Sequence, residues 1–189
     1  LVDFLVEIPY TIKVVSMIIS VDPLEPEAGK ELWKLYTDGA TSKDGSGAGL
    51  ILQSPKDEEI TYAHRLDSQV SNNEAEYEAL LAGLRLAKEV GSKELASLSD
   101  SLLITNQING TYEAKDSRMQ KYLDAFRTLI STFKSFSIKE ISWGKNARAD
   151  ALSKLASTSY DQLTKKELVE VLPKRSINNQ QVNTVSNTP

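Results

Sequence analysis

Hydrophobic and polar residues alternate in three short segments of the central region. Residues 32–38 combine alternation with aromatic side chains and are followed by Gly39, a glycine-rich turn at 45–49 leads into apolar residues 50–52, and residues 59–65 alternate again. Period-two alternation bounded by turn residues is typical of strands that bury one face. Three such strands in succession, the first ending at Gly39, predict an antiparallel meander.

Helical spacing of apolar residues follows the third predicted strand. Polar residues that can cap a helix stand at 71–73, acidic residues fill the next turn, and apolar residues then recur at Tyr77, Leu80, Leu81, Leu84 and Ala87. A second helix is predicted over about 116–134. Its apolar face consists of Met119, Tyr122, Leu123, Phe126, Leu129, Ile130 and Phe133.

Shorter elements complete the pattern. Residues 95–99 are an apolar strand that ends at Asp100, residues 136–142 alternate as a strand, and residues 146–156 form a short helix rich in Ala and Leu. The order is therefore βββαβαβα. This order predicts an α/β fold in which a mixed five-stranded sheet is packed against helices.

Three regions follow from these patterns. Residues 1–30 are interpreted as a connector, with a Pro- and Glu-rich linker at 22–29, and residues 31–158 as the folded domain. In the C-terminal region, 159–189, a helix is expected over 163–172. The polar tail 176–189 lacks periodicity and is expected to be disordered or to act as a tether.

The N-terminal region is apolar but is interrupted by charged residues and a proline. Its longest uncharged run, Val14–Val21, is far shorter than the ~20 residues of a membrane span, and no basic segment precedes it as in a secretory signal. The chain also begins without Met, as though cut from a longer protein. We expect a monomer inside the cell, nuclear or cytoplasmic, without a membrane partner.

Composition limits the chemistry. The 189 residues include no cysteine and one histidine, His64. Disulfide frameworks, thiolate zinc sites, cysteine nucleophiles and clusters of imidazoles are therefore excluded. Any metal ion must be a hard cation bound through oxygen. Taken alone, His64 is interpreted as a surface residue, and Trp33 and Trp143 as core residues, with Trp143 close enough to Asp150 to border a cleft.

Charge is distributed unevenly. The net charge of −4 argues mildly against a nucleic-acid partner, but residues 110–155 hold nine basic and five acidic residues, a local charge of +4. A charged stretch is more often a solvated face than a binding site. For Lys115, Arg118 and Lys121, phosphate binding and simple solvation are both retained as interpretations.

Four carboxylates fall at the ends of predicted elements. Asp38 and Asp100 end two strands that are natural neighbours in a mixed sheet, and Glu76 and Asp150 lie in the first turns of two helices. Glu76 is expected to face the sheet, unlike Glu74 and Glu78, which are expected to face outward. Four converging carboxylates repel one another unless cations lie between them, and paired Mg²⁺ ions can catalyse an in-line displacement at phosphorus.

Each acid also has an ordinary interpretation: Asp38 as a turn residue, Glu76 as an acid at a helix N-terminus, and Asp100 and Asp150 as surface residues. Their joint order along the chain favours a site. The stretches that contain them are Tyr36-Thr-Asp-Gly-Ala-Thr41, Ser71-Asn-Asn-Glu-Ala-Glu-Tyr-Glu-Ala-Leu80, Ser99-Asp-Ser101 and Asn146-Ala-Arg-Ala-Asp-Ala-Leu152, and a further one is Asn106–Asp116.

In these stretches the sequence resembles the type 1 ribonuclease H family, in the version carried by polyproteins of plant long-terminal-repeat retrotransposons. The resemblance spans about residues 32–157 and implies a ribonuclease H-like fold. It also implies an endoribonuclease that cuts the RNA strand of RNA–DNA hybrids with two Mg²⁺ ions, or Mn²⁺ as a substitute. By resemblance, the catalytic and metal-binding residues are Asp38, Glu76, Asp100 and Asp150.

The resemblance implies nucleic-acid contacts at Ser71, Asn73 and Asp44. Two features depart from the family pattern: the loop 139–145 lacks a histidine, and Leu102 stands where a glutamine is common. These departures keep open the alternative of a hybrid-binding relic without turnover. The N-terminus and the polar tail keep open a second one, a structural or tethering segment of a polyprotein that is active only when joined to its reverse transcriptase, with integrase as a further neighbour. A 3′–5′ exonuclease is disfavoured because Tyr36-Thr-Asp38 lacks the Asp-x-Glu pair.

Overall fold

The alternating segments form the predicted antiparallel meander. A computed structural model of the chain describes residues 31–66, 68–158, 168–172 and 175–179. Strand β1 pairs antiparallel with β2, and β2 pairs antiparallel with β3. Their bounds are Leu32–Ser42 for β1, Gly45–Gln53 for β2 and Glu59–Leu66 for β3. Alternation therefore placed β1 and β3, whereas residues 45–49, which were expected to be a turn, form the first part of β2.

Two parallel strands extend the sheet beyond β1. Strand β4 (Glu94–Ser99) pairs in parallel with β1, and β5 (Ser135–Glu140) pairs in parallel with β4. The five strands lie in the order β5-β4-β1-β2-β3, with a sixth, β6 (Leu168–Leu172), beside β3. The mixed five-stranded sheet predicted from the sequence is confirmed. The expected adjacency of the strands that precede Asp38 and Asp100 is also correct, since Thr37 is in register with Ser99.

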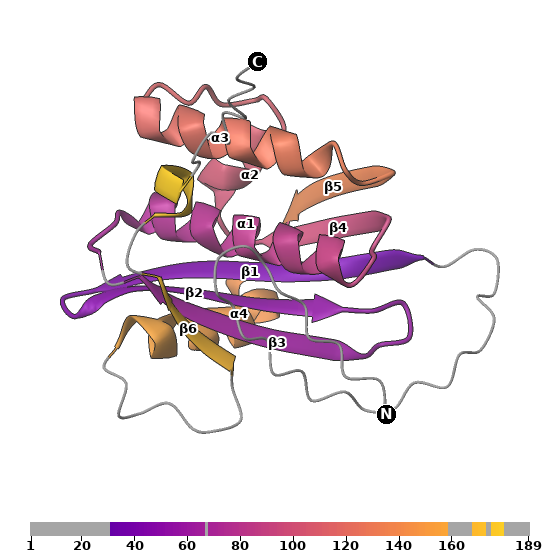
Figure 1. Ribbon diagram of the computed structural model, residues 1–189, viewed down its shortest axis with the longest axis horizontal. Coiled ribbons are helices and arrows are strands. Elements are labelled where there is room, and N and C mark those ends of the chain that lie inside the picture. Colours follow the sequence, from indigo (N-terminus) through magenta and orange to yellow (C-terminus); the bar gives the residue numbers. More distant parts are fainter. Residues whose placement is uncertain (1–30, 67, 159–167, 173–174, 180–189) are drawn as a thin grey trace, which may run out of the picture.

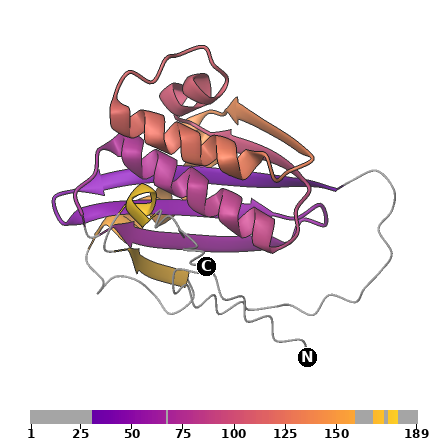
Figure 2. The ribbon, with the colours of Figure 1, turned by 45° about the horizontal axis from the view of Figure 1, so that its top comes forward.

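Helices cover both faces of the sheet (Figures 1 and 2). Helices α1, α2 and α3 lie on one side, and α4 packs on the other side, against β1 and β2. Their bounds are Asn72–Glu89 for α1, Leu102–Ile108 for α2, Ser117–Ile130 for α3 and Trp143–Ser157 for α4. Three of these helices match predicted ones, whereas the short α2 was not predicted.

The main core lies between the sheet and α1 and α3. It includes Leu35 and Leu50 from the sheet, Tyr77 and Leu84 from α1, and Phe126 from α3, all nearly inaccessible to solvent. A smaller cluster under α4 is formed by Ile51, Ala63, Leu152 and Ala156. The two clusters bury opposite faces of the same strands, which is why the alternation in β2 and β3 was less regular than in a half-exposed sheet.

Gly39 does not end the first strand, contrary to expectation. β1 continues to Ser42, and a side chain at Gly39 would place its Cβ 2.2 Å from the backbone nitrogen of Glu76. Glycine is therefore required here because α1 crosses β1 at this point. Gly49 plays a similar part under α4, where a Cβ would lie 2.5 Å from the carbonyl oxygen of Ala149.

The C-terminal region also differs from the prediction. Where the structure describes the expected helix 163–172, it shows a strand, β6 (Leu168–Leu172), which pairs in parallel with β3. An open strand edge offers unpaired backbone groups, and this pairing outweighed a weak helical pattern. Residues 176–179 form a 3-10 helix, η2 (Ser176–Asn179), in place of the start of a disordered tail. Residues 163–167 and 180–189 and the connector 1–30 lie outside the described residues.

Two single-residue predictions were wrong. His64 is 1% exposed and therefore buried, and Trp143 is 63% exposed at the start of α4. Trp33, in contrast, packs against the main core as expected. His64 is buried because it lies on the same face of β3 as Tyr62 of the main core, and because β6 pairs along the outer edge of β3. Among the described residues, no helix combines the length and the apolar character that crossing a membrane requires.

Candidate metal centre

Three carboxylates converge at the end of the β1–β4 pair. Asp38, Glu76 and Asp100 each offer one carboxylate oxygen, and these atoms all lie within 4.8 Å of one another. Asp38 comes from the middle of β1, Asp100 follows β4, and Glu76 belongs to the second turn of α1. The parallel pairing of β1 with β4 and the contact of α1 with Gly39 bring these three elements together.

Asp150 lines the same cleft. The cleft has a volume of about 580 Å³, and its lining includes all four predicted acids together with Asn72, Ser101 and Lys154. Asp150 is not part of the group of three, and its Oδ2 accepts a hydrogen bond at 2.8 Å from Lys154, one helical turn further along α4. The structure thus gathers the four predicted acids at one cleft, three of them tightly.

Burial and mutual repulsion shape the charge of this cluster. Burial raises the pKa of Asp38 to about 6; a hydrogen bond from Ser153 opposes this shift, and the charges of Asp100 and Asp150 add to it. Burial, followed by the charges of Asp38 and Asp100, raises the pKa of Glu76 to about 9. Such raised pKa values mean that nearby positive charge does not offset the burial and mutual repulsion of these carboxylates. A bound cation would supply that charge and favour their ionised forms.

Asn146 organises the centre, a role that was not predicted from the sequence. Its side-chain nitrogen donates to the carbonyl oxygen of Thr37 at 2.9 Å and to Oδ1 of Asp100 at 2.8 Å. It therefore joins β1, the end of β4 and the start of α4. The available signal was its spacing, because Asn146 and Asp150 are four residues apart and so share one face of the helix.

Ser153 is a second residue that sequence reasoning missed. Its hydroxyl donates to Oδ2 of Asp38 and is fully buried. The hydrogen bond favours the ionised form of Asp38 and fixes the orientation of its carboxylate. Ser153 lies one turn after Asp150, in the segment 146–156 that the sequence predicts only as a short helix rich in Ala and Leu.

The predicted nucleic-acid contacts lie on the surface and outside the cleft lining. Ser71 caps α1: its hydroxyl accepts from the backbone of Glu74 at 3.2 Å and its own backbone nitrogen donates to Oε2 of Glu74 at 2.7 Å. Arg118 pairs with Oε1 of Glu74 at 3.1 Å. All six candidates are exposed, namely Asp44, Ser71, Asn73, Lys115, Arg118 and Lys121. Their contact with nucleic acid stays a prediction.

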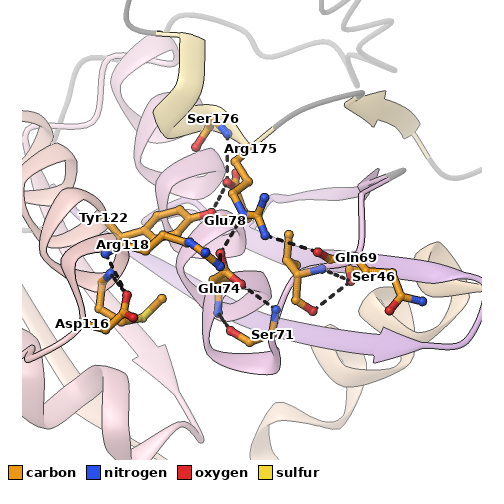
Figure 3. A network of polar contacts seen from close by, with 12 residues as sticks. Ser46, Gln69, Ser71, Glu74, Glu78, Asp116, Arg118, Tyr122, Arg175 and Ser176 are labelled. Carbon is orange, nitrogen blue, oxygen red and sulfur yellow. Dashed lines mark hydrogen bonds and ion pairs between the residues drawn. The ribbon is translucent and has the colours of Figure 1, made fainter.

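Glu74 and Glu78 do not face outward into solvent, contrary to expectation. Glu74 is 2% exposed and Glu78 is 1% exposed. Glu74 is paired with Arg118 and Arg175, and Glu78 accepts hydrogen bonds from Tyr122 and Ser176. The helical pattern showed correctly that these residues turn away from the sheet, but α3 and the C-terminal segment cover that face of α1 (Figure 3).

The strand order, the helices on both faces and the acidic cleft together define an α/β domain with the ribonuclease H-like fold. More particularly, the chain belongs to the reverse transcriptase-like family, whose model matches residues 36–156. This range contains all four predicted acids and excludes the C-terminal segment that packs on α1.

Individual relatives agree with this family. Over 131 residues the chain is 27% identical to ribonuclease HI of Halobacterium salinarum, and the aligned region covers 69% of this chain and 66% of that protein. It is 32% identical over 133 residues to the uncharacterised protein YpeP of Bacillus subtilis, and the aligned region covers 64% of this chain and 56% of YpeP. The chain therefore spans about two thirds or less of the length of these two relatives.

Solved structures show the same fold. The crystal structure of RNase H1 from Halobacterium salinarum superposes with a TM-score of 0.63 at 28% identity and covers 66% of this chain and 96% of that one. LC11-RNase H1 in complex with an RNA/DNA hybrid gives a TM-score of 0.60 at 26% identity, with 66% and 95% covered. This chain is thus similar to proteins of the RNase H1 type, and its acidic cluster is compatible with metal binding.

Proposed function

We propose that this domain is an endoribonuclease that hydrolyses the RNA strand of RNA–DNA hybrids with two divalent metal ions, Mg²⁺ or Mn²⁺. The observation that carries the proposal is the convergence of Asp38, Glu76 and Asp100 within 4.8 Å, at a cleft that Asp150 also lines. The similarity to ribonuclease HI and to an RNase H1 bound to a hybrid supports the choice of reaction and substrate.

The residues present fit a hard divalent cation. All the converging groups are carboxylates, which are the protein ligands that Mg²⁺ and Mn²⁺ prefer. Oε2 of Glu76 is buried and has no hydrogen-bond partner in the structure. A buried carboxylate oxygen without a donor is costly unless a cation binds to it. The donor set and this unpartnered oxygen both favour metal binding.

Each acid is assigned a part in holding the metal ions. Asp38 would contact both ions, Glu76 and Asp100 would complete one site, and Asp150 would complete the other. When bound, the ions would supply an activated water and stabilise the leaving oxygen of the phosphodiester. Asn146 and Ser153 fix the carboxylates of Asp100 and Asp38 before any metal binds, so that little reorganisation is needed at the moment of reaction.

Recognition of the hybrid would depend on backbone shape and on the 2′-hydroxyl groups of the RNA strand, not on base sequence. Lys115 and Lys121 are exposed near the start of α3 and are proposed to contact phosphates. Ser71 and Asn73, at the start of α1, are proposed to contact the nucleic-acid backbone, and Asp44, in the turn between β1 and β2, is proposed to touch the hybrid. Arg118 shares its guanidinium with Glu74, which leaves it oriented and half exposed for a phosphate.

The test is cleavage of a hybrid whose RNA strand carries a label, followed on a gel with Mg²⁺, with Mn²⁺ and with chelator. We expect the full chain to cut the hybrid in a metal-dependent manner and to leave the corresponding DNA duplex intact. Asp38→Asn should abolish cutting, whereas Asp124→Asn, which changes an exposed acid on α3, should not. Substantial cutting by the Asp38→Asn variant would falsify the assignment.

A second candidate is a hybrid-binding domain without turnover. The ion pair between Lys154 and Asp150 favours it, because the fourth acid is already partly neutralised in the absence of metal. Measuring hybrid affinity beside cleavage separates the two functions. Tight binding of the hybrid without cutting, in the wild type and in Lys154→Ala alike, would support this second candidate.

The setting of the domain is a separate proposal. The motifs resemble those of plant retrotransposon polyproteins, and the family is described as reverse transcriptase-like. We propose that reverse transcriptase and integrase regions of such a polyprotein are its natural neighbours. Comparison of hybrid cleavage by this chain and by a longer chain that includes those regions tests this, since equal rates would show that the neighbours are not needed.

A further inference from the structure

A C-terminal segment beyond the family match packs against α1. Strand β6 extends the sheet beside β3, and η2 follows it, with Ile177 packed against the main core. Figures 1 and 2 show η2, in yellow, beside α1. The family match ends at residue 156, so this contact is not explained by the shared ribonuclease H-like fold.

Arg175 joins this segment to the first turn of α1 (Figure 3). Its Nε lies 2.7 Å from Oε1 of Glu74, and its Nη2 donates to the carbonyl oxygen of Gln69 at 3.3 Å. Gln69 belongs to the connection between β3 and α1. One guanidinium thus holds both the helix and the chain that leads into it.

Ser176 holds the next turn. Its backbone nitrogen donates to Oε1 of Glu78 at 2.9 Å, and the hydroxyl of Tyr122 donates to the same oxygen at 2.6 Å. Glu74 and Glu78 are both almost completely buried. Buried carboxylates require hydrogen-bond donors, and Arg175 and Ser176 supply part of them, beside Arg118 for Glu74 and Tyr122 for Glu78. Arg175 and Ser176 together are called the C-terminal clamp.

The clamp and the metal centre use opposite faces of the same two helical turns. Glu74 and Glu78 are four residues apart and share a face, whereas Glu76, midway between them, projects from roughly the other side, because successive residues are about 100° apart. On that other side α1 is pressed against Gly39. The first turns of α1 therefore lie between β1 and the clamp, and the clamp fixes their rotation.

We propose that the C-terminal clamp is a positioning device for the metal centre: Arg175 and Ser176 hold α1 in the rotation that directs Glu76 toward Asp38 and Asp100. This inference rests on the proposed function, because it assigns Glu76 to metal binding. Arg175 touches none of the acids of the cleft in the structure and acts through Glu74. It is a positioning residue, and not a catalytic one.

The experiment uses three full-chain variants. Arg175→Ala removes the guanidinium, Arg175→Lys retains the charge, and Ser176→Pro removes the backbone N–H that serves Glu78 at the first residue of η2, where proline is tolerated. Arg127→Ala is the matched control, because Arg127 is an exposed arginine of α3 that pairs only with exposed Asp124 among the ion pairs of the described residues. Each variant is titrated with Mn²⁺ by calorimetry and assayed for hybrid cleavage as Mg²⁺ is varied.

We expect Arg175→Ala and Ser176→Pro to weaken Mn²⁺ binding about tenfold and to raise the Mg²⁺ concentration for half-maximal cleavage by the same factor. A loss of affinity of this size is typical when a residue that orients a metal ligand is removed. The KM for the hybrid at saturating Mg²⁺ should not change. Arg175→Lys should recover part of the loss, and Arg127→Ala should behave as the wild type does.

A purely structural role gives a different result. If Arg175→Ala and Ser176→Pro lower the melting temperature but bind Mn²⁺ as tightly as the wild type, the clamp does not position Glu76 and the proposal is overturned. A variant that fails to fold is replaced by Arg175→Met, which keeps the aliphatic stem and removes the guanidinium, and its unchanged Mn²⁺ affinity would have the same meaning. If the wild type binds Mn²⁺ but cuts no hybrid, the proposed reaction fails, while the Mn²⁺ titrations still decide the role of the clamp.

Discussion

Removing the charge of Asp38 should stabilise the metal-free protein while destroying its response to metal. The folded state raises the pKa of Asp38 from 3.8 to about 6, with burial as the largest cause. A carboxyl group with a raised pKa binds its proton more tightly in the folded than in the unfolded state. Its penalty is therefore absent below pH 3.8, grows as the pH rises, and is fully present above pH 6.

The magnitude follows from that shift. A difference of about two pKa units corresponds to about 3 kcal/mol, a net figure that already includes the hydrogen bond from Ser153, and burying the polar amide of the variant in the same site costs about 1 kcal/mol of this gain. In chelator near neutral pH, Asp38→Asn should thus be more stable than the wild type by about 2 kcal/mol. For a domain of this size, that difference raises the melting temperature by roughly 4–8 °C.

Added Mg²⁺ should change which of the two proteins, the wild type or Asp38→Asn, is the more stable. A ligand that binds only the folded state stabilises it by about 2.7 kcal/mol at one hundred times its dissociation constant. The wild type should gain such an increment and the Asp38→Asn variant almost none. Thermal melts in chelator and in Mg²⁺ measure both effects, with Asp124→Asn as the control for loss of an exposed charge. An Asp38→Asn protein that is less stable in chelator, or that gains as much from Mg²⁺ as the wild type, would refute the reasoning.

Three further predictions concern single side chains. Gly39→Ala should lower the free energy of unfolding by about 3 kcal/mol and remove most of the cleavage activity, since its Cβ would lie 2.2 Å from the backbone of Glu76. Gly144→Ala is the control: open space surrounds this position, and urea unfolding should show a change in stability of under about 1 kcal/mol. Asn146→Ala should lower the rate of hybrid cleavage at least tenfold at saturating Mg²⁺ with the fold retained by circular dichroism, because Asp100 loses the donor that orients it. Burial, aided by the charge of Arg85, lowers the pKa of His64 from 6.5 to about 4. As the pH falls from 6.5 to 4, the free energy of unfolding of the wild type should therefore decrease by about 3 kcal/mol relative to that of His64→Phe. Equal urea-unfolding profiles of the two proteins over this range would contradict the assignment.

Much of the fold followed from local patterns. Alternation located β1 and β3, the apolar run 50–52 located only the second half of β2, and the helical spacing of Tyr77, Leu80 and Leu84 located α1. The convergence of the acids at one cleft could also be predicted, because Asp38 and Asp100 lie on neighbouring parallel strands. These features depend on short-range periodicity and on simple rules for strand pairing.

The features that were missed depend on contacts between distant parts of the chain. Glu74 and Glu78 are expected to be exposed acids of an amphipathic helix. Their burial is made tolerable by partners from distant elements, Arg118 and Tyr122 of α3 and Arg175 and Ser176 about one hundred residues later. Leu168–Leu172 has no strong local preference, and the open edge of β3 makes it a strand. Gly39 resembled an ordinary turn residue because its partner, the backbone of α1, lies in another element.

The most direct test of the metal centre is the anomalous scattering of Mn²⁺ in crystals of the full chain. The account predicts a peak at about 2.0–2.2 Å from carboxylate oxygens of Asp38, Glu76 and Asp100, the distance typical of small hard cations. It also predicts that this peak is absent from crystals of Asp38→Asn. If crystals at Mn²⁺ concentrations that saturate the protein in solution show no peak among these three residues, the acids do not form a metal centre, and the proposed ribonuclease activity loses its basis.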